Sequence, residues 1–91
     1  MRMRRLHVDL NRIGSYADFY EFLKRELPLP PFFGNNLDAL YDAVSAQVQL
    51  PLEIEFSNCN AFKKRAFSKL IRVLCILDKQ IPDFHFKCRE N

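Results

Sequence analysis

The stretch Pro51-Leu-Glu-Ile-Glu-Phe56 decides the fold, because after the proline its side chains alternate strictly between apolar and acidic. Successive side chains of an extended chain point to opposite faces. The three apolar side chains would therefore share one face, while both glutamates would face outward. This pattern predicts a β-strand with one buried face.

Two further stretches, one near each end of the chain, show the same alternation. Arg4-Arg-Leu-His-Val-Asp-Leu10 places its three aliphatic side chains on one face, and Asp83-Phe-His-Phe-Lys-Cys88 pairs its two phenylalanines on one face. Both stretches are predicted to be strands.

Helical periodicity fills the segments between these strands. Ser15 is predicted to cap a first helix, with Asp18 three residues later as a short capping box. The apolar stripe of this helix comprises Tyr16, Phe19, Tyr20, Leu23 and Leu27. Prolines at positions 28, 30 and 31 end it, because proline lacks the backbone donor and disfavours helix in the residue before it.

Two more helices are predicted from the same signals. Asn35-Asn36 begins the second, and its buried stripe comprises Leu37, Leu40, Tyr41 and Val44. Asn60 caps the third, which is predicted to run to about Asp78. Its apolar line comprises Phe62, Ala66, Leu70, Val73 and Leu77.

The elements therefore follow one another in the order strand, helix, helix, strand, helix, strand. Helical crossovers between strands favour a parallel sheet. We expect an α/β fold, a small three-stranded parallel sheet with at least one face covered by helices. The chain has 91 residues, no repeat and no linker long enough to separate domains, so residues 1–91 are expected to form a single domain.

The formal net charge of +3 conceals a sorted distribution. Residues 1–13 carry four Arg and one Asp, a net charge of +3. Residues 14–55 carry two basic and seven acidic side chains, a net charge of −5, and residues 56–91 carry eight basic and three acidic side chains, a net charge of +5. The acidic middle of the chain is therefore a better guide to partners than the overall charge.

Several classes of protein are not expected. Cys59, Cys75 and Cys88 are odd in number and form no C-x-x-C motif, so neither a disulfide framework nor a zinc site is predicted. His7 and His85 fall in predicted strands and are expected to be structural. No apolar run approaches the roughly 18 residues of a membrane span, and no signal peptide is apparent. We expect a cytoplasmic protein with no cofactor and no small-molecule substrate.

Acidic and aromatic residues gather at the start of the second predicted helix. Asp38 and Asp42 form a like-charge pair with no Lys or Arg within one turn. Helical geometry places Tyr41 and Ser45 on the same flank as both carboxylates. The helix dipole alone would explain an acid in the first turn, and the aromatic residues could instead edge the core or anchor a loop. Phe32 and Phe33 of the preceding loop are expected to add exposed rings next to the acids, and the combination favours Phe32–Asp42 as a binding surface.

A family resemblance rests on Leu27-Pro-Leu-Pro-Pro-Phe-Phe-Gly-Asn-Asn-Leu-Asp-Ala-Leu-Tyr-Asp42 and on Leu50-Pro-Leu-Glu-Ile-Glu55. These stretches resemble the barstar family, intracellular inhibitors of the ribonuclease barnase. The shared pattern is an aromatic pair, Gly, a polar residue, Asn, Leu-Asp-Ala-Leu, an aromatic residue and Asp, then a strand that begins Pro-Leu. The resemblance is specific over residues 16–56 and implies a small parallel sheet packed with helices.

The resemblance also implies a mechanism. Barstar-like proteins plug a nuclease active site, and their carboxylates occupy positions where substrate phosphates would bind. Asp42 matches the main phosphate-mimicking acid and Asp38 its companion, while Phe32 and Tyr41 match aromatic residues that pack against the enzyme. The expected partner is a basic ribonuclease or nuclease toxin, bound 1:1. The predicted partner-binding surface comprises Phe32, Gly34, Asn36, Leu37, Asp38, Tyr41, Asp42 and Ser45.

Three departures from the family pattern point to a target other than barnase. Phe32 stands where a Tyr is usual, and Tyr41 stands where barstar has Trp. The third helix offers only Asp78 where barstar has further acids. We therefore expect a related nuclease as the target.

The basic residues of the third helix offer an alternative function. The residues Lys63-Lys-Arg65, Lys69 and Arg72, together with Arg2, Arg4 and Arg5, could contact the phosphates of RNA or another nucleic acid. The basic third helix could instead serve another kind of protein-interaction module. No aromatic stacking platform interleaves with these basic residues, so direct nucleic-acid binding is not expected. An enzyme is not expected either, because no nucleophile, metal-ligand set or phosphate loop accompanies the two carboxylates.

Overall fold

Three parallel strands in the order β1-β2-β3 form the sheet of the protein. The computed structural model describes residues 3–30 and 33–91. The predicted α/β fold with a three-stranded parallel sheet is confirmed. Along the chain the elements are β1 (Arg4–Asp9), the 3₁₀-helix η1 (Leu10–Arg12), α1 (Tyr16–Glu26), α2 (Leu37–Ala46), β2 (Leu52–Ser57), α3 (Ala61–Ala66), α4 (Ser68–Gln80) and β3 (Phe84–Cys88).

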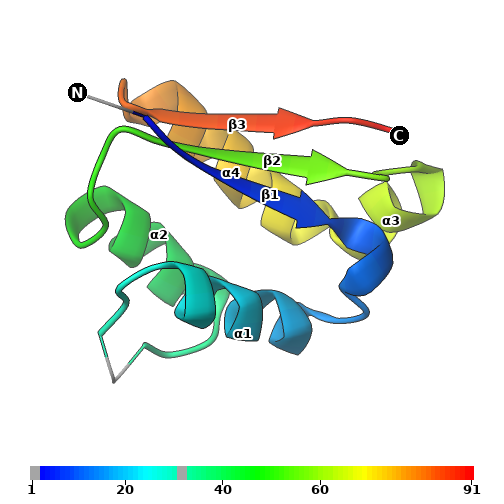
Figure 1. Cartoon of the computed structure of the whole chain (residues 1–91), viewed down its shortest axis with the longest axis horizontal. Helices are drawn as coiled ribbons and strands as arrows, with labels where there is room; N and C mark the ends of the chain where they lie inside the picture. The colour runs from blue at the N-terminus through cyan, green and yellow to red at the C-terminus, as the bar shows by residue number, and fades with distance from the viewer. Residues whose placement is uncertain (1–2, 31–32) are drawn as a thin grey trace.

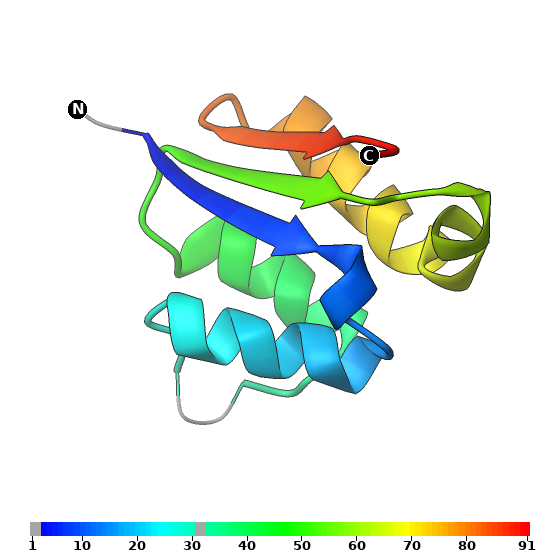
Figure 2. The same cartoon turned by 45° about the vertical axis from the view of Figure 1, so that its right-hand side comes forward.

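One face of the sheet carries the core. Leu6 of β1, Ile54 of β2 and Phe86 of β3 lie side by side in register, and all three are buried. Helices α1, α2 and α4 surround this face (Figures 1 and 2). The expectation that helices cover at least one face is therefore met, and in the described part of the chain no helix lies over the opposite face.

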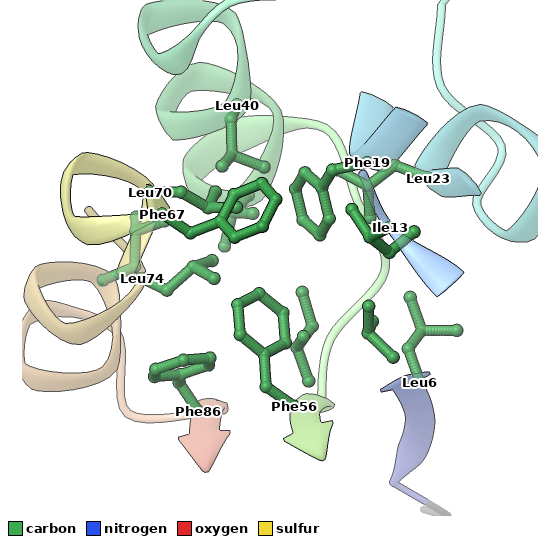
Figure 3. Close-up of a cluster of buried hydrophobic side chains, with 14 of the residues drawn as sticks. Leu6, Ile13, Phe19, Leu23, Leu40, Phe56, Phe67, Leu70, Leu74 and Phe86 are labelled. Carbon is green, nitrogen blue, oxygen red and sulfur yellow. The ribbon is translucent and has the colours of Figure 1, made fainter. Parts of the chain in front are cut away.

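Phe56 on the central strand joins the sheet to the helices (Figure 3). Its ring centroid lies 5.8 Å from that of Phe19 on α1 and 5.0 Å from that of Phe86 on β3, both in edge-to-face geometry. Leu40 of α2 and Leu74 of α4 extend the same cluster. Each fully buried side chain of this size contributes about 1.5–3 kcal/mol to folding. The buried faces of the strands and of the helices thus pack together around the ring of Phe56.

Charged side chains cover the face of the sheet that has no helix. Glu53 lies between Arg5 and Lys87, with an N···O separation of 3.6 Å to each, and Glu55 pairs with Arg89 at 3.1 Å. Both glutamates face away from the core as predicted, but Glu53 is only 7% exposed. The long side chains of the two flanking strands cover it, which the alternation within β2 alone could not predict.

The three predicted helix caps are confirmed. Ser15 Oγ accepts a hydrogen bond from the Asp18 N–H at 3.2 Å, while Asp18 Oδ2 accepts one from the Gly14 N–H at 3.0 Å. The side-chain oxygens of Asn36 and Asn60 each accept from the N–H three residues later, at 2.7 Å and 2.9 Å. Each cap satisfies a backbone donor that the first helical turn leaves unpaired.

The prediction of a single third helix from Asn60 to about Asp78 is wrong. The chain forms two helices, α3 and α4, which meet at Phe67 with φ −110° and ψ 26°. The Phe67 ring is 2% exposed and lies 5.4 Å from the ring of Tyr16, centroid to centroid. Burial of this ring against α1 accompanies the break, and no residue type in the sequence marks it.

The break also changes which side chains are buried. In the predicted apolar line, Leu70 and Leu77 are fully buried and Val73 is half-buried. Phe62 is 74% exposed and Ala66 is exposed, so the prediction is wrong for these two positions. Both precede the break, where the register of a continuous helix no longer applies.

The predicted strand ends differ from the observed ones by one residue. The first strand stops at Asp9 instead of Leu10, because the Asp9 carboxylate accepts a hydrogen bond from the Asn11 N–H at 3.0 Å and starts η1. The second strand is shifted forward by one residue, and the third begins one residue later than predicted.

Candidate functional site

Helix α2 is joined to the loop before it through the amide of Asn36. The Asn36 Oδ1 accepts from the Ala39 N–H at 2.7 Å, and its Nδ2 donates to the Gly34 carbonyl at 3.1 Å. A Cβ at position 34 would lie 3.1 Å from Asn36 Nδ2, so glycine allows this close approach. Asn35 has a φ of 53°, a conformation that Asn adopts more readily than most residues. These features fix the direction in which α2 begins.

The buried stripe of α2 determines which flank is exposed. Leu40, Ala43 and Val44 are each at most 2% exposed. The residues on the opposite flank, Asp38 and Asp42, are therefore exposed. Neither carboxylate forms an ion pair with any residue that the structure describes.

Both carboxylates line one hollow, which we call the α2 hollow. It has a volume of about 320 Å³, and its described lining contains no Lys, Arg or His. The lining residues are Pro30, Phe33, Gly34, Asn36, Asp38, Ala39, Asp42 and Gln47. The hollow thus combines two free negative charges, an aromatic ring and a loop held by hydrogen bonds, an arrangement suited to a cationic group.

The side chain of Tyr41 faces α4, unlike the carboxylates of Asp38 and Asp42, which line the α2 hollow. Its hydroxyl donates a hydrogen bond to Oε1 of Gln80 at the end of α4, and the residue is 36% exposed. The prediction that Tyr41 belongs to the buried stripe is therefore wrong. A tyrosine at the edge of a core can keep its ring partly covered while its hydroxyl finds a polar partner.

A second hollow, of about 390 Å³, adjoins Asp38 on the side of α1. Its wall consists of the aliphatic side chain of Leu37 and the aromatic rings of Tyr16 and Tyr20. Burial raises the pKa of the Tyr20 hydroxyl, and the neighbouring Tyr16 raises it further. Asp38 supplies the carboxylate in the described lining of this hollow.

The structure brings together part of the predicted partner-binding surface. Gly34, Asn36, Asp38 and Asp42 share the α2 hollow. Leu37 is half-buried beside it, Tyr41 faces α4, and Ser45 is exposed but lines neither hollow. Phe32 lies outside the described residues.

Phe33 was predicted as an exposed ring within the surface Phe32–Asp42, whereas Gln47 and Gln80 were not predicted. Phe33 is half-buried, lies 6.0 Å from the Tyr20 ring and lines the α2 hollow. Its place in an aromatic pair before the helix was the available signal. Gln47 lines the hollow and Gln80 bonds Tyr41. No sequence pattern marks either glutamine, because packing of the chain brings them there.

Asp78, the further acid suggested for the third helix, is engaged within the fold. It is half-buried, and its Oδ2 accepts a hydrogen bond from the Phe86 N–H at 3.2 Å. This bond connects α4 to β3. Asp78 is therefore committed to packing and adds no free carboxylate to the α2 flank.

Four basic residues of the alternative surface form contacts within the fold. Lys63 Nζ donates to the Ile13 carbonyl at 3.0 Å, and Lys64 pairs with Glu90 at 3.4 Å. Arg4 donates to a backbone carbonyl of α1, and Arg5 pairs with a glutamate of β2. The exposed Phe62 supplies an aromatic ring near this cluster, which the sequence had not indicated.

Cysteines and histidines form no further site in the described ranges. Cys59 is buried, whereas Cys75 and Cys88 are exposed and all three are free. Partial desolvation of the Cys88 thiol, and then the neighbouring Cys59, raises the pKa of Cys88 to about 12. Among residues 3–30 and 33–91 no group of three or more His, Cys, Asp or Glu side chains could hold a metal ion. No described helix is long and apolar enough to span a membrane.

Comparison with known proteins agrees with the resemblance. Residues 3–86 match the family model described as Barstar (barnase inhibitor). The chain is also 36% identical over 61 residues to the protein named "Putative ribonuclease inhibitor YrdF" from Bacillus subtilis (strain 168), a match that covers 62% of this chain and 67% of that protein. The chain therefore belongs to the barstar family of barnase inhibitors.

Proposed function

We propose that the protein inhibits a basic ribonuclease, or a nuclease toxin of that class, by a 1:1 complex that blocks the active site. The carboxylate of Asp42 takes the position of a substrate phosphate, with Asp38 beside it. The α2 hollow carries this proposal, since two exposed carboxylates meet there without a cation in the described lining. Membership of a family of barnase inhibitors supports it.

The charges explain why such a partner would bind. Active sites that bind phosphates present Arg, Lys and protonated His, and these groups bind carboxylates through charge-assisted hydrogen bonds. Within an isolated helix the like-charge pair Asp38 and Asp42 costs about 0.2–0.5 kcal/mol. A cationic partner converts this local repulsion into attraction at both positions.

The other predicted residues complete the surface in this proposal. Tyr41, Leu37 and Phe32 give the partner apolar contact area, and Ser45 gives a hydroxyl at the rim. Gly34 and Asn36 act through the shape of the loop. The protein performs no catalysis of its own, and it acts in the cytoplasm as an immunity protein or antitoxin. The departures at Phe32 and Tyr41 favour a nuclease related to barnase as the target.

A direct test titrates the purified protein into basic ribonucleases, beginning with a nuclease encoded by a neighbouring gene. Cleavage of a fluorogenic RNA should stop at one equivalent. Asp42→Ala should weaken inhibition between about tenfold and about a hundredfold, the range expected for the loss of a hydrogen bond between charged groups. Asp42→Asn should lose nearly as much, because it keeps the shape but not the charge.

Asp83→Ala is the matched control. Asp83 is an exposed acid outside the α2 hollow and forms no ion pair in the described part of the chain. Its removal changes the net charge equally and should leave inhibition unchanged. If Asp42→Ala inhibits as well as wild type, or if Asp83→Ala is equally impaired, the α2 hollow is not the inhibitory site.

A further inference from the structure

A further cavity lies between β1 and α1, away from the α2 hollow. Its volume of about 430 Å³ falls within the range of about 300–1,000 Å³ that is usual for small-molecule sites. It shares no lining residue with either hollow beside α2. In Figure 2, β1 passes above α1, with α2 behind them. We call this space the β1–α1 cavity.

Two guanidinium groups from different segments line the β1–α1 cavity. Arg12 belongs to η1 and Arg25 to the last turn of α1. Neither forms an ion pair with any described residue. Each guanidinium offers five N–H donors in a planar fork that matches the oxygens of a phosphate or carboxylate. Two guanidinium groups without a described ion-pair partner on one cavity favour an anionic ligand.

Asp9 is the carboxylate in the lining, and one of its two oxygens is already engaged in hydrogen bonds. Its Oδ1 accepts from Asn58 Nδ2 at 2.7 Å and from the Asn11 N–H at 3.0 Å. These hydrogen bonds are the chief reason that the pKa of Asp9 lies below its ordinary value. One negative charge of Asp9 against the two positive charges of Arg12 and Arg25 leaves these three side chains with a net charge of +1.

The remaining wall is apolar. Val8 and Ile13 are buried, at 1% and 6% exposure, and the half-buried ring of Phe22 stands on the α1 side. Such a wall accepts a hydrocarbon or aromatic body by the hydrophobic effect. The cavity thus pairs a cationic end with an apolar surface.

We propose that the β1–α1 cavity binds a small amphiphilic anion, a phosphate or carboxylate group on an apolar body. The oxyanion lies between Arg12 and Arg25, and the apolar body lies against Phe22. The two head groups share the same chemistry, because each presents two negatively charged oxygens that a guanidinium can bind through two parallel hydrogen bonds. This binding function is independent of nuclease inhibition at α2.

Titration monitored by ¹⁵N–¹H NMR tests the proposal on the full chain, with phenyl phosphate, benzoate, inorganic phosphate and benzyl alcohol as probes. Phenyl phosphate or benzoate should give saturable shifts at Val8, Ile13 and Phe22, and the tighter of the two identifies the head group. Inorganic phosphate should bind more weakly because it lacks the apolar body. Benzyl alcohol should bind more weakly still because it lacks the charge.

Variants distinguish binding in the cavity from general electrostatic attraction to the positive charge of the protein. Arg12→Gln and Arg25→Gln should each weaken binding about tenfold, the effect of losing roughly one charge-assisted hydrogen bond. Arg65→Gln removes the same charge from an exposed residue of α3 and should leave binding unchanged. All three positions are exposed, so spectra of the free variants should remain those of the folded protein.

Three results would overturn the proposal. One is the absence of saturable shifts with both phenyl phosphate and benzoate. A second is equal weakening by Arg65→Gln, which would show attraction to net charge alone. The third is binding of benzyl alcohol as tight as that of phenyl phosphate, because the two arginines would then have no role.

Discussion

At the scale of single residues, Asn36 has two separable roles. Its Oδ1 caps α2 and its Nδ2 holds the Gly34 carbonyl. Asn36→Ala removes both bonds and should lower the free energy of unfolding by about 1 kcal/mol. Asn36→Asp keeps the cap acceptor and should remain within a few tenths of a kcal/mol of wild type.

Urea unfolding of the three proteins measures this difference. Asn36→Asp also adds a negative charge to the α2 hollow, so nuclease inhibition by this variant reports on the loop and on the added charge together. An Asn36→Ala variant as stable as wild type would show that the cap contributes nothing measurable to the fold.

Asp9 gives a residue-scale prediction about pH. Hydrogen bonds from Asn58 and the Asn11 N–H, followed by the Arg12 charge, lower the pKa of Asp9 from the usual 3.8 in the folded state. A carboxyl with a depressed folded pKa stabilises the fold above its unfolded pKa, and this stabilisation is lost as the pH falls through the folded pKa. Asp9→Asn should therefore be less stable than wild type at pH 7.

The difference should shrink as the pH drops below about 3.8, because wild type then loses the charge that the variant lacks. Urea midpoints at pH 7, 5 and 3 measure it, and Asp83→Asn serves as the exposed control. The prediction would be contradicted if the difference in urea midpoint between Asp9→Asn and wild type stayed constant across this pH range.

At the scale of elements, the junction of α3 and α4 depends on Phe67. Its ring is 2% exposed against Tyr16, whereas Phe62 five residues earlier is 74% exposed. Phe67→Ala should cost about 3–5 kcal/mol because it leaves a cavity in the core. Phe62→Ala removes the same atoms from the surface and should change stability by no more than about 0.5 kcal/mol.

Thermal or urea unfolding of this matched pair measures the effect. Equal destabilisation by the two substitutions would mean that α3 and α4 form one continuous helix with Phe62 in the core, as the sequence periodicity predicted. A large effect of Phe67→Ala alone would agree with the observed break.

At the scale of the whole molecule, the sheet has one apolar face and one charged face. Glu53 is central to the charged face, between Arg5 and Lys87. Glu53→Gln leaves these two cations without their shared partner and should cost about 1 kcal/mol at low salt. The cost should fall in 1 M NaCl, where the Debye length is about 3 Å.

Glu21→Gln is the control, because the Glu21–Lys24 pair is an exposed contact within one helix. Its loss should cost no more than about 0.5 kcal/mol. If Glu53→Gln has no larger effect than Glu21→Gln, burial of Glu53 between two strands gives the ion pairs no added strength.

Much of the secondary structure could be predicted from interactions between residues that are close together in the sequence. Alternation in Leu52–Ser57 and in the two outer strands depends on the geometry of an extended chain, so strand identity could be predicted. Caps at Ser15, Asn36 and Asn60 involve residues three positions apart. The exposure of Asp38 and Asp42 on one helical flank followed from the buried stripe alone.

Contacts between distant segments decided the rest. The break at Phe67 accompanies burial of its ring against Tyr16, fifty-one positions earlier, and no local signal marks it. Tyr41 left the predicted stripe because Gln80 of α4 accepts its hydroxyl, and Asp78 became unavailable because it accepts a backbone N–H of β3. The β1–α1 cavity likewise is lined by Arg12 and Arg25 from two different segments of the chain.

The sequence by itself thus determined the α/β class, the family and the acidic flank of α2, because periodicity, capping and the family motif act within short stretches of chain. Only the tertiary structure decided which of these side chains remain free for a partner. A side chain is free or engaged according to what packs beside it, and the neighbours of Tyr41, Glu53 and Asp78 come from segments that the sequence does not place next to them.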